Sequence, residues 1–197
     1  MEKPAVTTTE IHPLLARRWS PRSFSSQKVD PQTLKRIFEA ARWAPSSFND
    51  QPWRFIVGQK GDPTYSRIME TLVEFNQKWA STAPVLILAV GKTVSSKTGK
   101  PNSAFRYDTG QSIAYITFQA MHEGLFAHQM GGFDADKARQ LFQIPEEYQP
   151  LTVTAIGYKE DPSKLEEDFR KMEVAPRQRI PLEEIVFADT FGEKFAW

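Results

Sequence analysis

The spacing of apolar residues predicts a helix near the start of the chain. Asp30 followed by Pro31 is a favourable helix start, because the aspartate can cap free backbone N–H groups and proline fits the first helical position. Apolar side chains then recur at helical spacing: Leu34, Ile37, Phe38 and Ala41. The pattern predicts a helix from residue 30 to about residue 44, where Pro45 ends it.

Two apolar segments that follow are typical of β-strands. Residues 53–57 are one, and residues 84–90 are a strand buried on both faces, since apolar side chains occupy consecutive positions. Residues 65–79, between them, have a helical pattern. Residues 92–102 are rich in Lys, Ser, Thr and Gly, which predicts a mobile loop and a candidate cover for a site.

The second half of the chain begins with a long helix, which we expect over residues 103–128. It is apolar on two sides, as in a helix central to the core or to a subunit interface. Several small residues on it allow another backbone to approach closely: Gly110, Ala114, Ala120 and Gly124.

A shorter helix capped by Asp134, a strand over residues 151–157 and a helix over residues 163–172 complete the expected elements. The C-terminal tail is rich in aromatic side chains: Phe187, Phe191, Phe195 and Trp197. We expect so aromatic a tail to pack on another subunit or on the chain's own core.

Composition limits the classes of protein that need to be considered. A length of 197 residues predicts one domain spanning residues 1–197, and a formal charge of +1 provides no general attraction to nucleic acid or membranes. The absence of cysteine excludes disulfides and thiolate chemistry. Residues 1–10 lack a signal-type apolar run, and the longest apolar stretch is too short to cross a bilayer. We therefore expect a cytoplasmic protein with no membrane or nucleic-acid partner.

The most informative polar segment is the loop of residues 45–55. It combines serine hydroxyls and two side-chain amides between two prolines with a tryptophan directly after the second proline. Amides offer donors and acceptors while the indole offers a flat apolar wall, a mixture that suits a heteroaromatic ligand. The alternative for Ser46, Ser47 and Asn49 is ordinary helix-end and turn chemistry.

Two arginine clusters are candidates for binding a phosphate. Residues 17–24 contain three arginines and two serines, and Arg177 and Arg179 form a second cluster near the other end of the chain. Either cluster alone is typical of a solvated basic surface. A phosphate dianion would be well held if folding brought the two clusters together.

The glycine pair in residues 130–134 has two interpretations as well. It can form the turn before a helix, and it can let backbone N–H groups approach a flat ring closely. The two roles are compatible.

Other chemistries have less support in the sequence. The three histidines show no paired metal-ligand spacing, so we expect no metal. Residues 110–114 lack the second glycine of a nucleophile elbow, and residues 97–101 lack the upstream glycine of a phosphate loop. No Gly-x-Gly-x-x-Gly motif occurs, which argues against a Rossmann cofactor domain.

Six ordered motifs together resemble the nitroreductase family of FMN-dependent oxidoreductases, of the short type. The similarity covers nearly the whole chain. The motifs are Arg18-x-Ser20-x-Arg22, the loop from Pro45 to Trp53, Asn76-x-Lys78, Asp108-x-Gly110, Gly131-Gly132-Phe133-Asp134 and Arg177-x-Arg179.

The resemblance implies an α+β homodimer with a central, mostly antiparallel sheet flanked by helices, C-terminal arms exchanged between subunits, and FMN between the subunits. By motif, Arg18, Ser20, Arg177 and Arg179 would hold the FMN phosphate. The complete set of cofactor contacts that it implies is Arg18, Trp19, Ser20, Arg22, Pro45, Ser46, Ser47, Asn49, Asn76, Lys78, Met130, Gly131, Gly132, Arg177 and Arg179.

Within that set, Ser46, Ser47 and Asn49 would contact the flavin or its ribityl chain, and Asn76 its pyrimidine edge. Arg22 and Lys78 would lie near N1 and the C2 carbonyl, where positive charge should raise the flavin's potential. The N–H of Gly131 would approach N5.

The activity implied is ping-pong hydride transfer from NADH or NADPH through flavin N5 to a nitroaromatic, quinone or related acceptor. No protein acid, base or nucleophile is required, so no catalytic side chain is assigned. Alternatives are a flavin-binding sensor or scaffold without turnover, or a specialised reaction such as reductive dehalogenation or flavin cleavage. A nucleic-acid binder is a further alternative, which the balanced charge disfavours.

Overall fold

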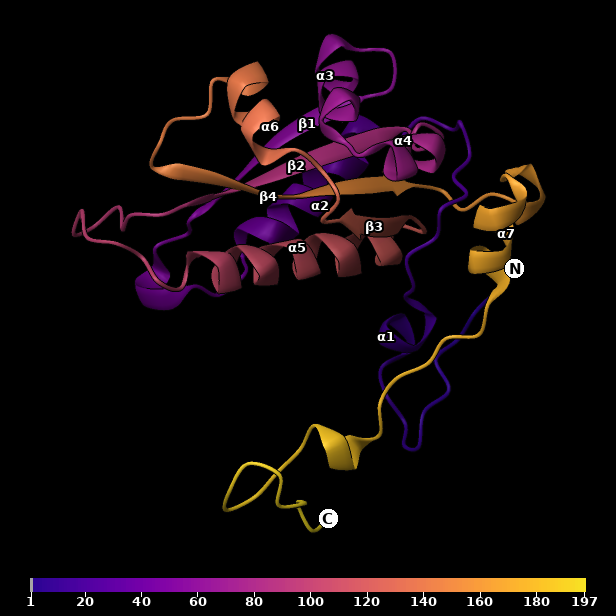
Figure 1. The fold of residues 1–197 in the computed structure, drawn as a ribbon, viewed down its shortest axis with the longest axis vertical. Helices are drawn as coiled ribbons and strands as arrows, with labels where there is room; N and C mark the ends of the chain where they lie inside the picture. The colour runs from indigo at the N-terminus through magenta and orange to yellow at the C-terminus, as the bar shows by residue number, and fades with distance from the viewer. Residues whose placement is uncertain (1) are drawn as a thin grey trace.

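One antiparallel sheet organises residues 2–197, the part of the chain that the computed structural model describes (Figure 1). The strand order is β1-β2-β4-β3, and every neighbouring pair is antiparallel. The bounds are Trp53–Gln59 for β1, Val85–Lys92 for β2, Phe126–Met130 for β3 and Tyr148–Gly157 for β4. The prediction of an α+β fold with a central antiparallel sheet is therefore confirmed.

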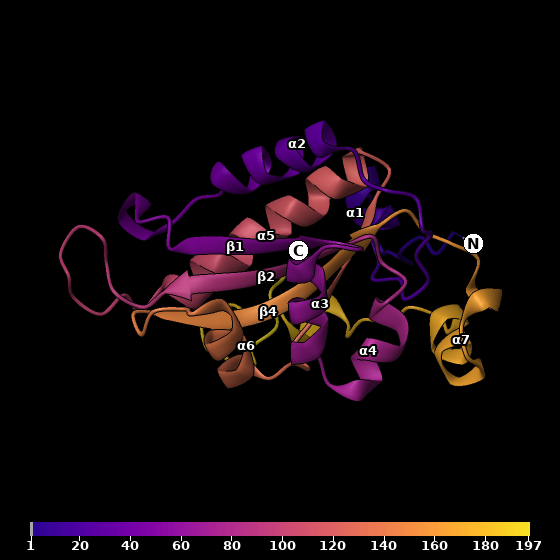
Figure 2. The ribbon, with the colours of Figure 1, turned by 90° about the horizontal axis from the view of Figure 1, so that it is seen from above.

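Helices cover both faces of this sheet (Figure 2). The α-helices are α1 Pro13–Arg17, α2 Pro31–Arg42, α3 Pro63–Thr71, α4 Glu74–Ala80, α5 Phe105–His122, α6 Ala135–Phe142 and α7 Glu167–Val174. Short 3-10 turns are Ser47–Asn49, Pro162–Lys164 and Leu182–Glu184. Helices α2 and α5 lie on one face, and α3, α4 and α6 lie on the other.

Strand β2 is apolar throughout because both of its faces meet helices. Val85 and Ile87 pack in the cluster formed with α2 and α5, whereas Leu86 and Leu88 pack in the cluster on the opposite face. Successive side chains of a strand point to opposite faces, so a two-sided core needs an uninterrupted apolar run. The prediction of a strand buried on both faces is confirmed.

The expected start of α2 is also confirmed. The side chain of Asp30 accepts a hydrogen bond from the N–H of Thr33 at 2.9 Å, and Pro31 occupies the first turn. The helix ends at Arg42, slightly before the expected end near residue 44.

Three expected helices differ in the structure: two are interrupted, and one is shorter. Residues 65–79 form two helices, because Leu72 leaves the helical conformation and makes a β-bridge with Phe133. Residues 163–172 form a 3-10 turn and then α7. The long helix ends at His122 rather than at residue 128, and Gly124 takes a φ of 78°. That left-handed residue turns the chain back so that β3 can follow.

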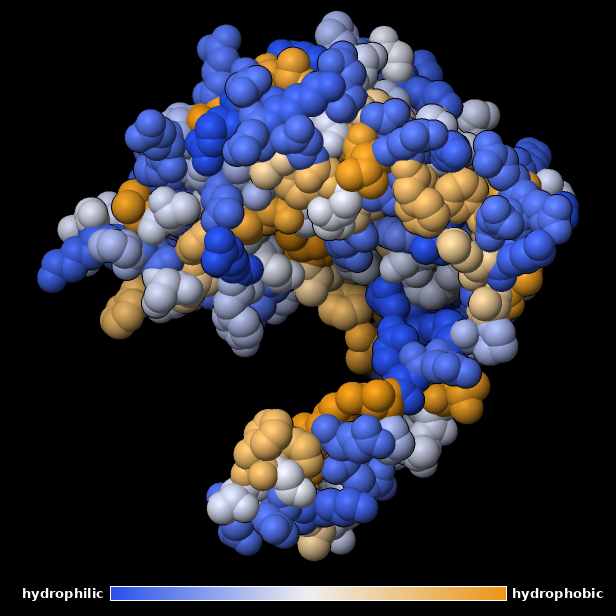
Figure 3. All heavy atoms as spheres, viewed as in Figure 1, coloured by the Kyte–Doolittle hydropathy of each residue, from blue (hydrophilic) through white to orange (hydrophobic). Residues whose placement is uncertain are grey.

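The C-terminal arm, residues 176–197, leaves the body of the molecule (Figures 1 and 3). Its aromatic rings pack on one another, Phe187 on Phe191 at 4.9 Å and Phe195 on Trp197 at 5.1 Å between centroids. Phe191 is 96% exposed and Trp197 is 80% exposed. The tail therefore does not cover the chain's own core, and packing on another subunit stays a prediction.

Candidate functional site

Positive side chains from both ends of the chain surround a cavity of about 230 Å³, called here the cationic cavity. It lies where the N-terminal segment meets α7 and the start of the arm, on strongly hydrophilic surface (Figure 3). Its lining is Lys3, Arg18, Trp19, Ser20, Arg22, Met172, Ala175, Pro176, Arg177 and Arg179. Folding thus brings the two arginine clusters together.

Hydrogen bonds fix the two halves of this cavity. Nη1 of Arg177 donates to the backbone oxygens of Lys3 at 2.7 Å and Ala16 at 2.9 Å. Nη1 of Arg18 donates to the hydroxyl of Ser20 at 3.1 Å. The guanidinium groups are therefore held around the cavity before any ligand arrives.

The charges around the cationic cavity repel one another. Burial lowers the pKa of Arg18, and the charges of Arg177 and Arg179 lower it further. Burial also lowers the pKa of Lys3, and burial followed by the charge of Arg179 lowers the pKa of Arg177. No acidic side chain among residues 2–197 lines the cavity. A bound dianion would relieve this repulsion and replace the hydration lost on burial.

Two buried donors at the cavity have no acceptor within the described chain, Nε1 of Trp19 and Nε of Arg22. Trp19 is only 5% exposed. Buried N–H groups are normally hydrogen-bonded, so an unpaired pair marks a place where another molecule completes the site. Donors of this kind fit an anionic group such as a phosphate.

Glu173 links α7 to the segment that carries Arg22. Its carboxylate is 1% exposed and accepts hydrogen bonds from the backbone N–H of Arg22 at 3.0 Å and of Ser23 at 3.4 Å. Burial raises the pKa of this carboxyl, while those two N–H groups act in the opposite direction. Sequence reasoning missed Glu173, although its position four residues after the buried Phe169 places both on one helical face.

A second part of the candidate site joins α4 to the end of β3. Nδ2 of Asn76 donates to the backbone oxygen of Gly132 at 3.0 Å, and Asn76 is 9% exposed. Met130, the last residue of β3, is buried, whereas Gly131 is exposed with open space around its Cα. The structure therefore brings together the predicted residues Asn76, Met130, Gly131 and Gly132.

We expect the two glycines to respond differently to substitution. A Cβ on Gly132 would lie 2.8 Å from Nδ2 of Asn76 and 3.0 Å from Cγ2 of Val73, whereas a Cβ on Gly131 would meet nothing within 4 Å. Gly132→Ala should lower the free energy of unfolding by about 1–2 kcal/mol, and Gly131→Ala should change it by less than about 0.5 kcal/mol. Urea denaturation of the two variants tests this, and equal values would contradict the close approach at Gly132.

Lys78 takes a different direction from Asn76. It lies on the exposed face of α4, where its ammonium is 3.5 Å from the carboxylate of Glu74. Residues two apart on a helix face away from each other, so the structure does not bring Lys78 to the contact between Asn76 and Gly132.

The polar loop of residues 45–51 lies at the opposite end of the sheet from the cationic cavity (Figure 1). The N–H of Ser47 donates to Asp108 of α5 at 3.1 Å. The hydroxyl of Ser46 accepts from the N–H of Gln51, whose side chain donates to the amide oxygen of Asn49, both at 3.1 Å. Pro45 is exposed next to them. Within one chain, this loop does not meet the arginines.

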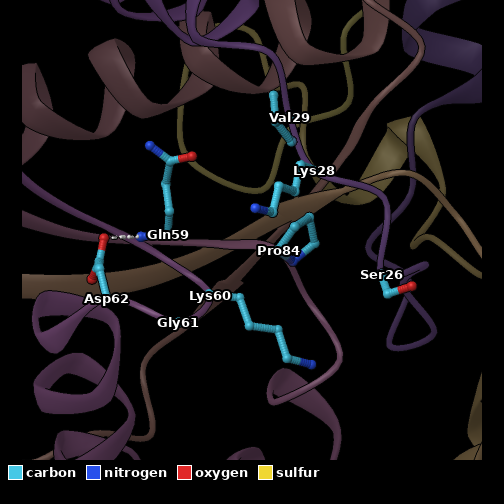
Figure 4. A pocket seen from close by; sticks show the side chains of 8 residues that line it. All are labelled: Ser26, Lys28, Val29, Gln59, Lys60, Gly61, Asp62 and Pro84. Carbon is cyan, nitrogen blue, oxygen red and sulfur yellow. Dashed lines mark hydrogen bonds between the residues drawn. The ribbon is translucent and has the colours of Figure 1, made fainter.

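A hollow larger than the cationic cavity lies at a different place (Figure 4). It measures about 540 Å³ and lies beside the turn after β1 and the start of β2. Lys28, Lys60 and Asp62 contribute to its lining, and Nζ of Lys60 donates to the backbone oxygen of Ser81 at 2.6 Å. It contains none of the predicted site residues, so size alone does not identify the site.

Comparison with known proteins agrees with this fold. A solved structure described as an oxidoreductase containing FMN is 34% identical, and the match covers 96% of each chain with a TM-score of 0.90. An uncharacterised 15.4 kDa protein of Mycolicibacterium smegmatis is 32% identical over 150 residues, which are 71% of this chain and 97% of that protein. An NADH dehydrogenase of Thermus thermophilus is 26% identical over 201 residues, and the match covers 86% of this chain and 91% of that protein.

The solved structure and the Thermus protein carry the names of oxidoreductases, and the family model defines the class further. The model of the Nitroreductase family matches residues 15–66 and 59–158. The chain belongs to the Nitroreductase family.

Proposed function

We propose that this chain is an FMN-dependent oxidoreductase that passes hydride from NAD(P)H to a nitroaromatic, quinone or related acceptor in a ping-pong reaction. The observation that carries the proposal is the cationic cavity, where four arginines, a lysine and two unpaired buried donors surround a space without acidic lining residues. That donor set fits the phosphate of FMN. When bound, FMN supplies a hydride-accepting centre that no side chain offers.

The residues of the cationic cavity would bind the cofactor phosphate. Arg18, Ser20, Arg177 and Arg179 are the ligands we propose, with the buried N–H of Trp19 as a further donor. Arginine suits this role because its planar group donates two parallel hydrogen bonds to phosphate oxygens. Lys3, which sequence reasoning missed, adds a fifth positive charge.

The residues near α4 would orient the ring system. Asn76 offers an amide for the pyrimidine edge. A Cβ at Gly131 would meet nothing within 4 Å, and we propose that this open space lets the ring approach the N–H of Gly131 with its N5. Arg22 reaches the cavity, with its guanidinium carbon 6.0 Å from the centroid of the Trp79 ring. Lys78 would have to leave Glu74, which costs little because exposed ion pairs contribute at most about 1 kcal/mol.

We propose that a second copy of the chain completes the site. Pro45, Ser46, Ser47 and Asn49 are too distant from the cationic cavity to serve the same cofactor within one chain, so a homodimer would supply them across its interface. The exposed aromatic residues of the arm would then be buried on the partner. We also propose that residues 1–197 act as one domain and that the protein is cytoplasmic.

An absorption spectrum of the purified protein tests the function. We expect flavin bands that bleach with NADPH or NADH under anaerobic conditions and return when a nitroaromatic or quinone is added, because reduced flavin loses its visible absorption. Bands that persist with both donors would instead favour a sensor or scaffold. The absence of bands after reconstitution with FMN would contradict the proposal.

A further inference from the structure

A cleft beside the polar loop is separate from the cationic cavity and has a volume of about 370 Å³. Residues 47–50 form one wall, and residues 95–104 form the other. The volume lies within the range of small-molecule sites. Ser47 belongs to both the cleft and the proposed flavin contacts, so in the proposed arrangement a ligand here would lie beside the cofactor.

A buried carboxylate holds the two walls together. Asp50 is 9% exposed and accepts hydrogen bonds from the hydroxyl of Ser95 at 3.1 Å, the N–H of Ser96 at 3.0 Å and the side-chain amide of Asn102 at 2.8 Å. All three donors belong to residues of the second wall. The cleft is therefore a built feature rather than a gap between unconnected loops.

The backbone of the first wall is strained. Phe48, Asn49 and Gln51 have φ values of 50°, 55° and 48°, so three neighbouring residues with side chains occupy the left-handed region. Strain of this kind persists only where the surroundings impose it, and it concentrates at binding sites. Phe48, in this segment, is 88% exposed and lines the cleft.

The second wall supplies positive charge. Lys97 and Lys100 line the cleft, and Nζ of Lys97 donates to the backbone oxygen of Phe48. Lys92 extends the same loop, and residues 91–107 contain no acidic residue. The three donors to Asp50 are neutral and do not cancel its charge, so Lys97, Lys100 and Asp50 together give the lining of the cleft two positive charges and one negative charge. A ligand would meet the ring of Phe48 and this net positive charge.

We propose that this cleft selects aromatic electron acceptors that carry an anionic substituent such as a carboxylate. The aromatic part would pack against Phe48, and the carboxylate would lie near Lys97 and Lys100. This inference rests on the proposed function, because the acceptor must reach the cofactor beside Ser47.

The test compares para-nitrobenzoate with para-nitrobenzamide, which match in shape and differ in charge. Calorimetric titration of the FMN-reconstituted protein should give tighter binding of the benzoate by about fivefold or more. In the variant Lys97→Gln/Lys100→Gln, that preference should fall to about twofold or less, while binding of the amide changes less than about twofold. Glutamine at position 97 can still donate to the oxygen of Phe48.

The variant Lys28→Gln/Lys60→Gln is the matched control, since it removes the same charge at the hollow of Figure 4. It should keep the preference for the benzoate. The proposal would be overturned if the natural chain showed no preference for the benzoate, or if the preference survived in the variant Lys97→Gln/Lys100→Gln. A changed KM for NADPH with an unchanged affinity for the benzoate would assign the lysines to the donor's phosphate and overturn it as well.

The two proposals fail in different ways. If the protein binds no flavin, or its flavin is never reduced, the proposed function is wrong. The titration does not depend on turnover and can be repeated on the protein without flavin, so it still decides whether the cleft distinguishes the two charges.

Discussion

The double variant Arg18→Ala/Arg179→Ala is expected to lose most of its affinity for FMN while it keeps its fold. Each guanidinium would donate a charge-assisted hydrogen bond to the phosphate, and two such bonds contribute about 3 kcal/mol or more, which is on the order of a hundredfold in Kd. Titration of the apoprotein with FMN, followed by flavin fluorescence, measures the change. If the variant is saturated at the same FMN concentration as the natural chain, the phosphate assignment is refuted.

The melting temperature of the apoprotein separates this effect from unfolding. The charges of Arg177 and Arg179 lower the pKa of Arg18, so these three cations repel one another. Removing Arg18 and Arg179 relieves this repulsion in the empty cavity. We therefore expect the variant apoprotein to melt at the same temperature or higher. The control Arg42→Ala/Lys137→Ala removes the same charge from exposed ion pairs with Glu39 and Glu70, and it should bind FMN normally.

The second large effect is a loss of stability in acid that originates at His128. Burial lowers the pKa of this imidazole to about 4, and the charges of Arg22 and Arg18 act in the same direction. The ring packs on Trp79 at 4.4 Å, and its Nδ1–H donates to the backbone oxygen of Pro21 at 2.9 Å. His128 therefore positions the segment that carries Arg18 and Arg22, and it does so as a neutral ring.

The sign of the pH dependence follows from the lowered pKa. Between pH 6.5 and pH 4 the unfolded chain binds a proton at this histidine that the folded chain excludes, so stability falls as the pH falls. The expected loss relative to neutral pH is about 2 kcal/mol at pH 5 and about 3 kcal/mol at pH 4.

The variant His128→Phe isolates this contribution from those of the acidic residues. It can keep the packing on Trp79 but loses the hydrogen bond to Pro21, so it should be about 1 kcal/mol less stable at pH 7. Below about pH 5 it should be more stable than the natural chain, because it has no proton to exclude. Urea denaturation across this pH range measures both, and parallel stability curves would contradict the assignment to His128.

Local signals in the sequence were sufficient for much of the secondary structure. Asp30 and Pro31 specify a helix start through their own geometry, and the apolar run of β2 specifies burial on both faces. The interruption at Leu72 could not be anticipated, because a β-bridge to Phe133, far along the chain, causes it. The sequence pattern predicts a helix as far as His128, whereas the structure has His128 in β3. The reason is similar, because β3 depends on pairing with β4.

Residue identity is a property of the chain before it folds, and six motifs already contain the arginines, amides and glycines that resemble those of a flavin site. How these residues combine depends on the tertiary structure. It gathers Arg18 and Arg177 around one cavity, adds Lys3 and Glu173, and leaves the loop of residues 45–51 at the far end of the sheet. The physical reason is that a distance between residues remote in sequence depends on long-range strand pairing and side-chain packing, which no local pattern encodes.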